Sequence, residues 1–329
     1  MERRKTFNIF DFISNHLAWF ILLVILIFFG IFSDHFFSLN NILNILSQNA
    51  YLIVAATGLT FLMMSGEMDL SVGFAMSLVG VVCGGLMVNM GVPFWICIMV
   101  TIALAIFISL LNTYLAIKLK LMILIITIAM MTILQGFSYI ISQSKTISGF
   151  PAEFKFIGQG MLFGFLPVGI VIMFAVFFIM SFVLNKTYYG RYVYALGGNK
   201  EAARLAGINI NRMRYSIAII VGFCIGLADI MLISRLGSVQ SVIGPGTEFS
   251  VIGGVFLGGV SIRGGEGKLS GVFAGILCIA LLSNGMQLAG INIYAQYIVR
   301  GTIMIAAIGF DAYQLNRRNM IKKIKEANG

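Results

Sequence analysis

Charged residues are scarce in this chain. Asp, Glu, Lys and Arg make up 10% of its 329 residues, and 59% of the residues are hydrophobic. A soluble domain usually contains about 25% charged residues. A water-soluble core has no use for so many apolar side chains, so most of this surface must face lipid. The composition excludes an ordinary soluble protein and predicts an all-α membrane protein with many spans.

Histidine and paired cysteine are scarce too, which excludes several kinds of catalytic and metal site. The two histidines, His16 and His35, flank the first apolar run, so we expect neither a metal site nor a catalytic triad. The four cysteines lie inside apolar runs and form no CxxC pair. They are therefore predicted to be small core residues, and we expect no cofactor.

A nucleotide-binding loop of the form GxxxxGK[ST] is also missing. The nearest candidate is Gly267-Lys268, but Ile262 stands where the first glycine belongs and Leu269 follows the lysine. We therefore expect that the chain does not bind ATP itself and is not an enzyme. The formal net charge of +10 does not indicate nucleic acid. Its basic residues lie between apolar runs, where membrane topology and anionic lipid account for them.

Ten apolar runs predict ten spans, since a crossing takes about 20 residues. The predicted spans are 17–33, 44–64, 71–90, 94–117, 121–142, 162–184, 215–233, 249–262, 269–289 and 294–311. The first follows a basic N-terminus with no cleavage site, so we expect an uncleaved span. The eighth is short and rich in glycine, so we expect it to be broken or partly re-entrant, covered by protein or a cavity.

Basic residues concentrate on one side of these spans. If the N-terminus is cytoplasmic and ten spans alternate, 18 of the 22 Lys and Arg fall on the cytoplasmic side, as the positive-inside rule requires. We therefore expect both termini in the cytoplasm. The predicted segments are 1–16 (cytoplasmic N-terminus), 17–184 (first part of the bundle), 185–214 (cytoplasmic coupling loop), 215–311 (remaining spans) and 312–329 (basic tail).

Two glycine-rich interruptions suggest two sets of five spans. The first, SGEMDLSVG, covers residues 65–73, and the second, GGVSIRGGEG, covers residues 258–267. Because five is odd, the second set would enter the membrane upside down, which is a recurring transporter design. The alternative is chance, since 37 residues are glycine. The predicted breaks in the second segment are Gly258, Gly259, Gly264 and Gly265.

The loop at 190–208, GRYVYALGGNKEAARLAGI, predicts a helix of about two turns between a good N-cap, Asn199, and a good C′ residue, Gly207. So short a helix is marginal in water, so it needs a surface to rest on. We expect its apolar patch of Ala202, Ala203, Leu205 and Ala206 to dock in a groove on a cytoplasmic protein. The alternative is a helix lying on lipid headgroups. The predicted docking residues are Asn199, Lys200, Glu201, Ala202, Ala203, Arg204, Leu205, Ala206 and Gly207.

The glycine at the first interruption and polar residues within or between apolar runs are candidates for a solute pathway or gate. They are Gly66, Glu67, Asp69, Ser71, Asn112, Gln135, Asn284 and Gln287. A charge near hydrocarbon normally pairs or faces a water-filled cavity, and the predicted partner of Glu67 is either Arg263 or Lys268. Asp69 is expected to cap the helix that begins near Ser71. The amides are expected either to line the path or to link helices by hydrogen bonds. Asp229 and Arg300 have no assigned role.

The loop at 190–208 closely resembles that of ribose-type ABC sugar importer permeases, and other blocks match in order over residues 40–311. SGEMDLSVG at 65–73 resembles the family's TGGIDLSVG, and GGVFLGGVSIRGGEGKLSG at 253–271 resembles its AAVVIGGTSLSGGxGSIxG block. Asn112 and the stretch 282–285 match its GLLN and LNNG positions. The sequence departs from the family at Glu67, which replaces a glycine, at 122–123 and at Ala129.

The resemblance implies a permease subunit in the bacterial inner membrane that works with a second permease copy or homologue. An ATP-binding cassette subunit would hydrolyse ATP, and a periplasmic sugar-binding protein would deliver a monosaccharide: a ribose-like pentose, another simple sugar or autoinducer-2. The helix after Asn199 would be the element that couples the permease to the ATPase. Two other functions stay open. One is an ion-coupled secondary carrier with coupling sites at Glu67, Asp69 and Asp229; the other is a scaffold, which the repeated glycine breaks disfavour.

Overall fold

The computed structural model shows a bundle of helices and describes residues 17–32, 36–292, 294–299, 301–303, 305–306 and 309. Seven helical segments in these ranges are long and apolar enough to cross a membrane. They are α3 (Leu39–Met64), α4 with the π-helical turn η1 (Val72–Gly84 and Gly85–Asn89), α5 (Phe94–Leu119), α6 (Ile123–Ser142), α8 (Val168–Lys186), α11 (Ile210–Leu236) and α13 (Leu269–Leu288). The predicted helical membrane protein with many spans is confirmed.

Shorter elements join these spans. Two are apolar helices, α2 (Leu17–Phe32) and α12 (Thr247–Leu257), and three lie in connections, α7 (Ala152–Gln159), α9 (Tyr188–Gly198) and α10 (Lys200–Leu205). Strand β1 (Ile147–Ser148) pairs antiparallel with β4 (Ser238–Val239), and β2 (Met161–Leu162) pairs with β3 (Leu166–Pro167) in a hairpin.

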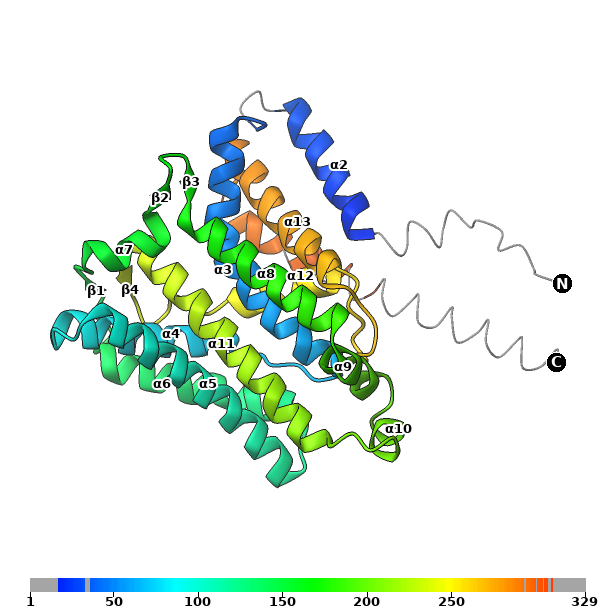
Figure 1. The fold of residues 1–329 in the computed structure, drawn as a ribbon. Coiled ribbons are helices and arrows are strands. Elements are labelled where there is room, and N and C mark those ends of the chain that lie inside the picture. The colour runs from blue at the N-terminus through cyan, green and yellow to red at the C-terminus, as the bar shows by residue number, and fades with distance from the viewer. Residues whose placement is uncertain are drawn as a thin grey trace.

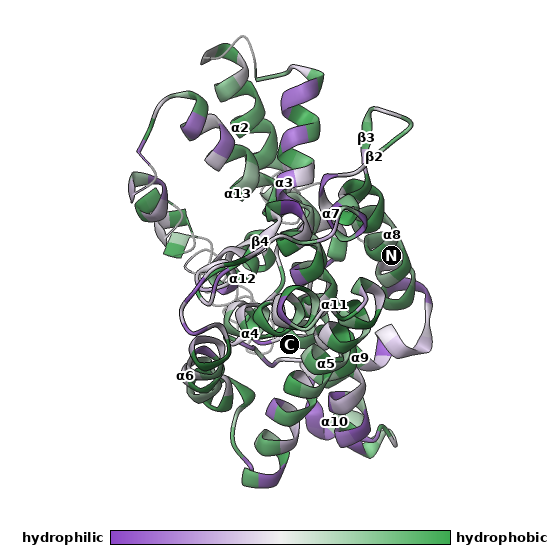
Figure 2. Ribbon diagram, turned by 90° about the vertical axis from the view of Figure 1, so that its left-hand side faces the viewer, coloured by the Kyte–Doolittle hydropathy of each residue, from purple (hydrophilic) through white to green (hydrophobic). Residues whose placement is uncertain are grey.

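Helices α3 and α11 form the centre of the bundle. In an apolar 18-residue stretch of each of these helices, 72% of the residues are buried, compared with 28% in α5 and α8 and 33% in α6. Gly222 and Gly226 of α11 are spaced four residues apart, and a Cβ at Gly222 would lie 2.7 Å from the Ala105 carbonyl oxygen of α5. Small residues at this spacing let two membrane helices approach closely. The outer helices carry largely apolar residues (Figure 2), which suits a face toward lipid.

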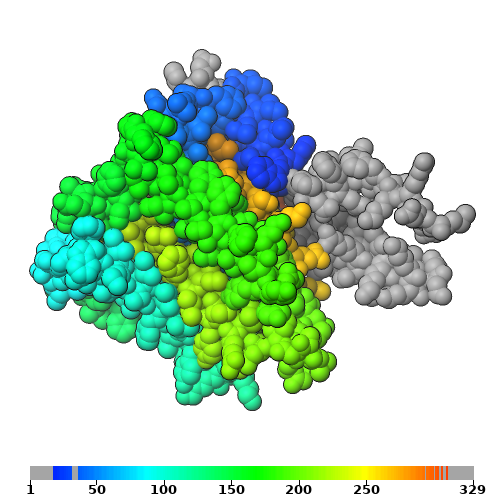
Figure 3. Space-filling model, viewed as in Figure 1, coloured from blue at the N-terminus to red at the C-terminus, as the bar shows by residue number. Residues whose placement is uncertain are grey.

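The bundle has two ends of different character (Figure 1). Helix α7 and all four short strands lie at one end, which we call the strand end. Helices α9 and α10 and the turn between α5 and α6 lie at the other, which we call the α10 end. The segment containing α9 and α10 is at the surface of the α10 end in the space-filling view (Figure 3). The next helix, α11, then returns through the centre of the bundle to the strand end.

Two predicted spans need correction, and one prediction is confirmed. The span predicted at 162–184 begins only at Val168, because residues 161–167 form the β2–β3 hairpin, in which Phe163 and Gly164 adopt positive φ angles. The span predicted at 215–233 is longer, from Ile210 to Leu236. Helix α12 has 11 residues, which extend about 16 Å, so the eighth predicted span is indeed too short for a crossing.

The last predicted span, 294–311, lies only partly within the described residues, and Arg300 lies outside them. The residues 1–16 and 312–329, predicted to be cytoplasmic ends, also lie outside the described ranges. The arrangement of ten spans in two inverted repeats therefore stays a prediction.

Candidate functional site

Helix α10 is a separate, fully capped helix of six residues. The Asn199 side chain accepts a hydrogen bond from the Ala202 amide at 2.9 Å. At the other end Gly207 has φ +86°, its amide donates to the Arg204 carbonyl, and the Ile208 amide donates to the Ala203 carbonyl. These two bonds close a Schellman motif, which satisfies the last helical carbonyls. The helix predicted between Asn199 and Gly207 is confirmed.

One side of α10 rests on the protein and the other is exposed. Ala203 is buried, so it is not part of an exposed apolar patch, and that part of the prediction is wrong. Ala202, Leu205 and Ala206 are exposed, and the Leu205 side chain is 77% exposed. Arg204 and Glu201 form an ion pair one turn apart on the exposed side. The free surface of α10 is therefore an apolar area bordered by charges.

The segment before α10 meets both glycine-rich interruptions at one point, which we call the glycine junction (Gly66, Gly197, Gly198, Gly264 and Gly265). A Cβ at Gly197 would overlap the Met64 carbonyl oxygen, and a Cβ at Gly265 would lie 2.7 Å from the Gly198 Cα. The Gly265 amide donates a 2.8 Å hydrogen bond to the Met64 carbonyl at the end of α3. Glycine permits these backbone contacts because it has no Cβ.

The other two predicted glycine breaks lie at the end of α12. Gly258 follows the last residue of that helix, and a Cβ on it would lie 2.5 Å from the Val272 Cα of α13. Gly259 has φ +82°, in the left-handed region, so the chain turns away from the helix there. A close helix contact and a turn thus account for these two glycines.

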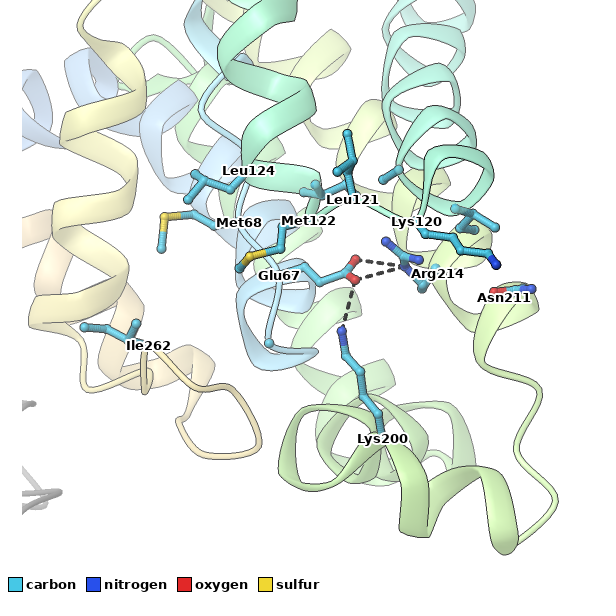
Figure 4. Close-up of a pocket in the computed structure, with 14 residues that line it drawn as sticks. Glu67, Met68, Lys120, Leu121, Met122, Leu124, Lys200, Asn211, Arg214 and Ile262 are labelled. Carbon is cyan, nitrogen blue, oxygen red and sulfur yellow. Dashed lines mark hydrogen bonds and ion pairs between the residues drawn. The ribbon is translucent and has the colours of Figure 1, made fainter.

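A cavity of about 570 Å³ opens at the α10 end (Figure 4). Its walls come from the break between α3 and α4, the end of α5 with the turn before α6, the start of α11, the first residue of α10 and the loop after α12. Its lining residues are Gly66, Glu67, Met68, Ala116, Ile117, Lys120, Leu121, Met122, Ile123, Leu124, Lys200, Asn211, Arg214 and Ile262.

Glu67 is the acid in this cavity, and it pairs with two cations. Its carboxylate lies 2.9 Å from the Arg214 Nε of α11 and 3.1 Å from the Lys200 Nζ of α10, as Figure 4 shows. The predicted partners, Arg263 and Lys268, are therefore wrong. Sequence spacing does not single out Arg214 as a site residue, because it is one of six cations in the predicted loop at 185–214.

Asp69 and Ser71 form a buried polar cluster in the break between α3 and α4. The Ser71 amide and hydroxyl both donate to the Asp69 Oδ1, at 2.7 and 2.6 Å. The expected helix cap at Asp69 is wrong, because α4 begins at Val72 with Ser71 as its N-cap and has no side-chain capping bond. The Asp69 carboxylate instead accepts both of its bonds from Ser71, the residue before the helix. Burial raises the pKa of Asp69, and the hydrogen bonds from Ser71 oppose that rise.

Asn112 extends this polar cluster onto α5. Its Nδ2 donates to the Ser71 hydroxyl at 3.0 Å, while its Oδ1 has no hydrogen-bond partner in the described part of the chain, although the residue is buried. An unpaired buried acceptor costs about 1 to 3 kcal/mol. Asn112 lies one turn before Ala116, which lines the cavity, so these two positions share one face of α5. The cavity wall on α5 therefore leads toward the polar cluster.

The other predicted pathway amides lie elsewhere. The Gln135 side chain donates to the Ser241 carbonyl at 2.8 Å. Asn284 and Asn41 exchange two 3.1 Å hydrogen bonds between α13 and α3. These bonds match the alternative expectation that such amides link segments of the bundle. Gln287 is exposed near the end of α13.

Asp229 of α11 is fully buried, and neither of its carboxyl oxygens has a hydrogen-bond partner in the described ranges. A Cβ on Gly80 of α4 would lie 2.9 Å from one of these oxygens, so the glycine leaves room for the carboxyl group. The structure does not bring Asp229 to the cavity lining.

The fold and the site together define a membrane permease subunit, with apolar spans, an irregular polar break inside the bundle and a short exposed helix connected to that break. The chain belongs to the family described as "Branched-chain amino acid transport system / permease component", which matches residues 41–308.

Its relatives include sugar permeases. The chain is 33% identical to the ribose import permease protein of Haemophilus influenzae over 313 residues, which cover 94% of this chain and 96% of the relative. It is 38% identical to the L-arabinose transport system permease protein of Escherichia coli over 268 residues, 82% of this chain and 81% of the relative. No solved structure matches the chain. These matches make the chain a sugar ABC transporter permease, a transport subunit of the inner membrane.

Proposed function

We propose that this chain is the membrane-spanning subunit of an ABC importer that carries a monosaccharide into the cell with ATP hydrolysed by a partner. The observation that carries the proposal is the construction of α10. It is capped at both ends, exposes Leu205 and lies next to the glycine junction. A six-residue helix has too few hydrogen bonds to be stable alone, so its exposed face suits a docking surface.

The proposed partner at α10 is an ATP-binding cassette subunit. The chain has no phosphate-binding loop of its own, which fits an ATPase in a separate chain. A second permease copy or homologue and a periplasmic sugar-binding protein would complete the importer. The sugars in the names of the relatives, ribose and L-arabinose, are the first candidates for transport.

The α10 end is proposed to face the cytoplasm. Basic residues collect there at the ends of α5 and α8, in α9 and α10, at the start of α11 and in the loop after α12. The strand end holds Lys145, Lys155 and Arg235. An excess of Lys and Arg marks the cytoplasmic side of membrane proteins. By the same rule both termini are proposed to be cytoplasmic.

The solute route is proposed to pass the polar cluster of Asp69, Ser71 and Asn112 and to leave through the cavity. The unpaired Asn112 Oδ1 supports this route, because a sugar hydroxyl is a hydrogen-bond donor. A sparse polar lining suffices where a separate binding protein captures the sugar.

The test is reconstitution with a candidate ATP-binding cassette ATPase and a candidate periplasmic sugar-binding protein from the same organism. The tagged permease should co-purify with the ATPase, and proteoliposomes should take up D-ribose or L-arabinose only with ATP. Leu205→Ser should weaken co-purification, because it removes the apolar contact. Leu119→Ser is the matched control, since Leu119 is exposed at the same end but lies outside α10. Equal ATPase recovery with both variants would reject α10 as the docking element.

An ion-coupled carrier is the second candidate, and the observation that favours it is the buried Asp229, whose carboxyl group has no partner in the described ranges. Ionisable groups inside membranes often mark ion pathways. Sugar uptake by this chain alone, driven by a proton gradient and lost in Asp229→Asn, would support the carrier and reject the ABC importer.

A further inference from the structure

The Glu67 carboxylate joins the α3–α4 break to two helices that lie far from it in the sequence. Lys200 lies 133 residues away and Arg214 lies 147 residues away. The described residues contain three ion-paired couples, and the two that join different elements both use Glu67. The third, Glu201 with Arg204, lies within α10. Glu67 is therefore the charged connection between α10, the α3–α4 break and α11.

We propose that Glu67 is a positioning residue that connects α10 to the α3–α4 break through a breakable ion pair with Lys200, so that movement of α10 moves the break. This inference rests on the proposed function, because the movement of α10 would come from the partner ATPase. It assigns to Glu67 the role of passing movement from α10 to the α3–α4 break, which goes beyond the docking of α10 on the ATPase.

The burial of the three side chains determines which contact breaks. The Glu67 side chain is 8% exposed, that of Arg214 is 13% exposed and that of Lys200 is 49% exposed. A buried carboxylate that loses its only cation is strongly destabilising, whereas a half-exposed lysine that leaves an ion pair regains water at little cost. Arg214 therefore holds the Glu67 side chain in place when Lys200 leaves.

The two sides of this ion pair lead to the docking helix and to the polar cluster. Lys200 is the first residue of α10, directly after the cap Asn199. Glu67 stands two residues before Asp69, which holds Ser71 by two hydrogen bonds. A displacement of α10 that pulls on Glu67 therefore acts on the short segment that positions Asp69.

The cavity beside the ion pair gives this segment room to move. Met68 lies between Glu67 and Asp69 and lines the cavity, as does Lys120 (Figure 4). Lys120 is a cation in the same cavity that forms no ion pair with the described residues. It therefore serves as a matched control for the loss of a positive charge.

The experiment measures how the break responds to ATP in the complete importer complex in lipid nanodiscs. A Met68→Cys parent is labelled with a maleimide; the four native cysteines are buried and add little background. We expect ATP to change the labelling rate in the parent. Lys200→Gln should reduce that change by about two- to fivefold, the range for a partly exposed ion pair. Lys200→Arg, which keeps the charge, and Lys120→Gln should retain it.

A double-mutant cycle on the sugar transported per ATP hydrolysed provides the second readout, with D-ribose and L-arabinose as probes. Glu67→Gln and Lys200→Gln should each lower this ratio, and the double variant should lower it no further than the stronger single variant. Glu67→Gln also leaves the largely buried Arg214 side chain without its carboxylate. The Lys200 side chain is half-exposed, so we expect Lys200→Gln to preserve the fold. Its labelling result therefore tests the proposal even if Glu67→Gln misfolds.

The outcomes separate this inference from the proposed function. If the ATPase does not associate with the unmodified chain, the proposed function fails, and with it the source of α10 movement. If the complex forms and hydrolyses ATP, but Lys200→Gln labels like Lys120→Gln, the role of Glu67 is overturned and the permease assignment stands. The role of Glu67 is also overturned if the double variant lowers the sugar transported per ATP by the product of the two single effects. The two residues would then act separately.

Discussion

Gly197→Ala is the sharpest structural test of the glycine junction. The added methyl group would overlap the Met64 carbonyl oxygen and lie 3.0 Å from the Gly264 carbonyl carbon. Both atoms belong to the backbone, so no rotamer change relieves the contact. The segments must separate, which strains the 2.8 Å bond from the Gly265 amide to Met64. Overpacking and the lost buried hydrogen bond cost about 1 to 3 kcal/mol each.

The neighbouring glycine supplies the control for this prediction. A Cβ at Gly198 would meet no atom within 4 Å, and alanine is favoured over glycine in a helix by about 1 kcal/mol. Gly198→Ala should therefore leave stability unchanged or slightly raised, whereas Gly197→Ala should lower it. The two variants differ by one position in the same last turn of α9, so differences in expression or detergent affect both alike.

Heating with a thiol-reactive dye measures this difference, because the four cysteines are buried and become reactive only when helices separate. They are Cys83, Cys97, Cys224 and Cys278. The transition should occur at a lower temperature in Gly197→Ala than in the parent and in Gly198→Ala. Equal midpoints for the two variants would refute the close backbone contact between α9 and the end of α3.

Three other predictions follow from individual contacts. Gly222→Ala should lower the same thermal midpoint, because its Cβ would lie 2.7 Å from the Ala105 carbonyl oxygen. The control Gly136→Ala places its Cβ in open space and should leave the midpoint unchanged. Similar midpoints for the two variants would contradict the close crossing of α11 and α5. Asn199→Ala should weaken ATPase co-purification, since loss of an N-cap costs about 1 kcal/mol. Asn199→Asp keeps a capping oxygen and should preserve co-purification. If both variants lose co-purification, the Asn199 amide contacts the ATPase directly and does not act through the cap. Asn112→Leu should reduce sugar uptake more than ATPase recovery, because it removes the unpaired acceptor without touching α10; equal uptake by the variant and the parent would remove Asn112 from the route.

Features that depend on neighbouring residues were predictable from the sequence. The cap at Asn199 and the turn at Gly207 are set by hydrogen bonds within a few residues, and so is the bond from Ser71 to Asp69. Long apolar runs located most of the spans for the same reason, since hydropathy is a local property. The hairpin at 161–167 was missed because Phe163 and Phe165 extend the apolar run, while the turn depends on backbone angles.

Features that depend on distant segments were not predictable. Several cations had the right charge for Glu67, and only the folded chain selects Lys200 and Arg214 over Arg263 and Lys268. The burial of Ala203 likewise depends on how α10 rests on the bundle, because neighbouring alanines in the same helix are exposed. Sequence spacing gives the face of a helix but does not give what lies against it.

In the sequence the two glycine-rich interruptions indicate a repeat, and their positions in space give them a more specific role. Both reach the segment before α10, where Gly197 and Gly198 meet Gly66, Gly264 and Gly265 backbone to backbone. Such contacts contain no side chains that rearrange, so a displacement of α9 passes to both interruptions together. The ion pair of Glu67 lies beside this contact but can break. If α10 docks on the ATPase as proposed, its movement would act through the glycine junction on the end of α3 and on the loop after α12 together. The ion pair of Glu67 with Lys200 would hold or release the segment at Asp69 separately.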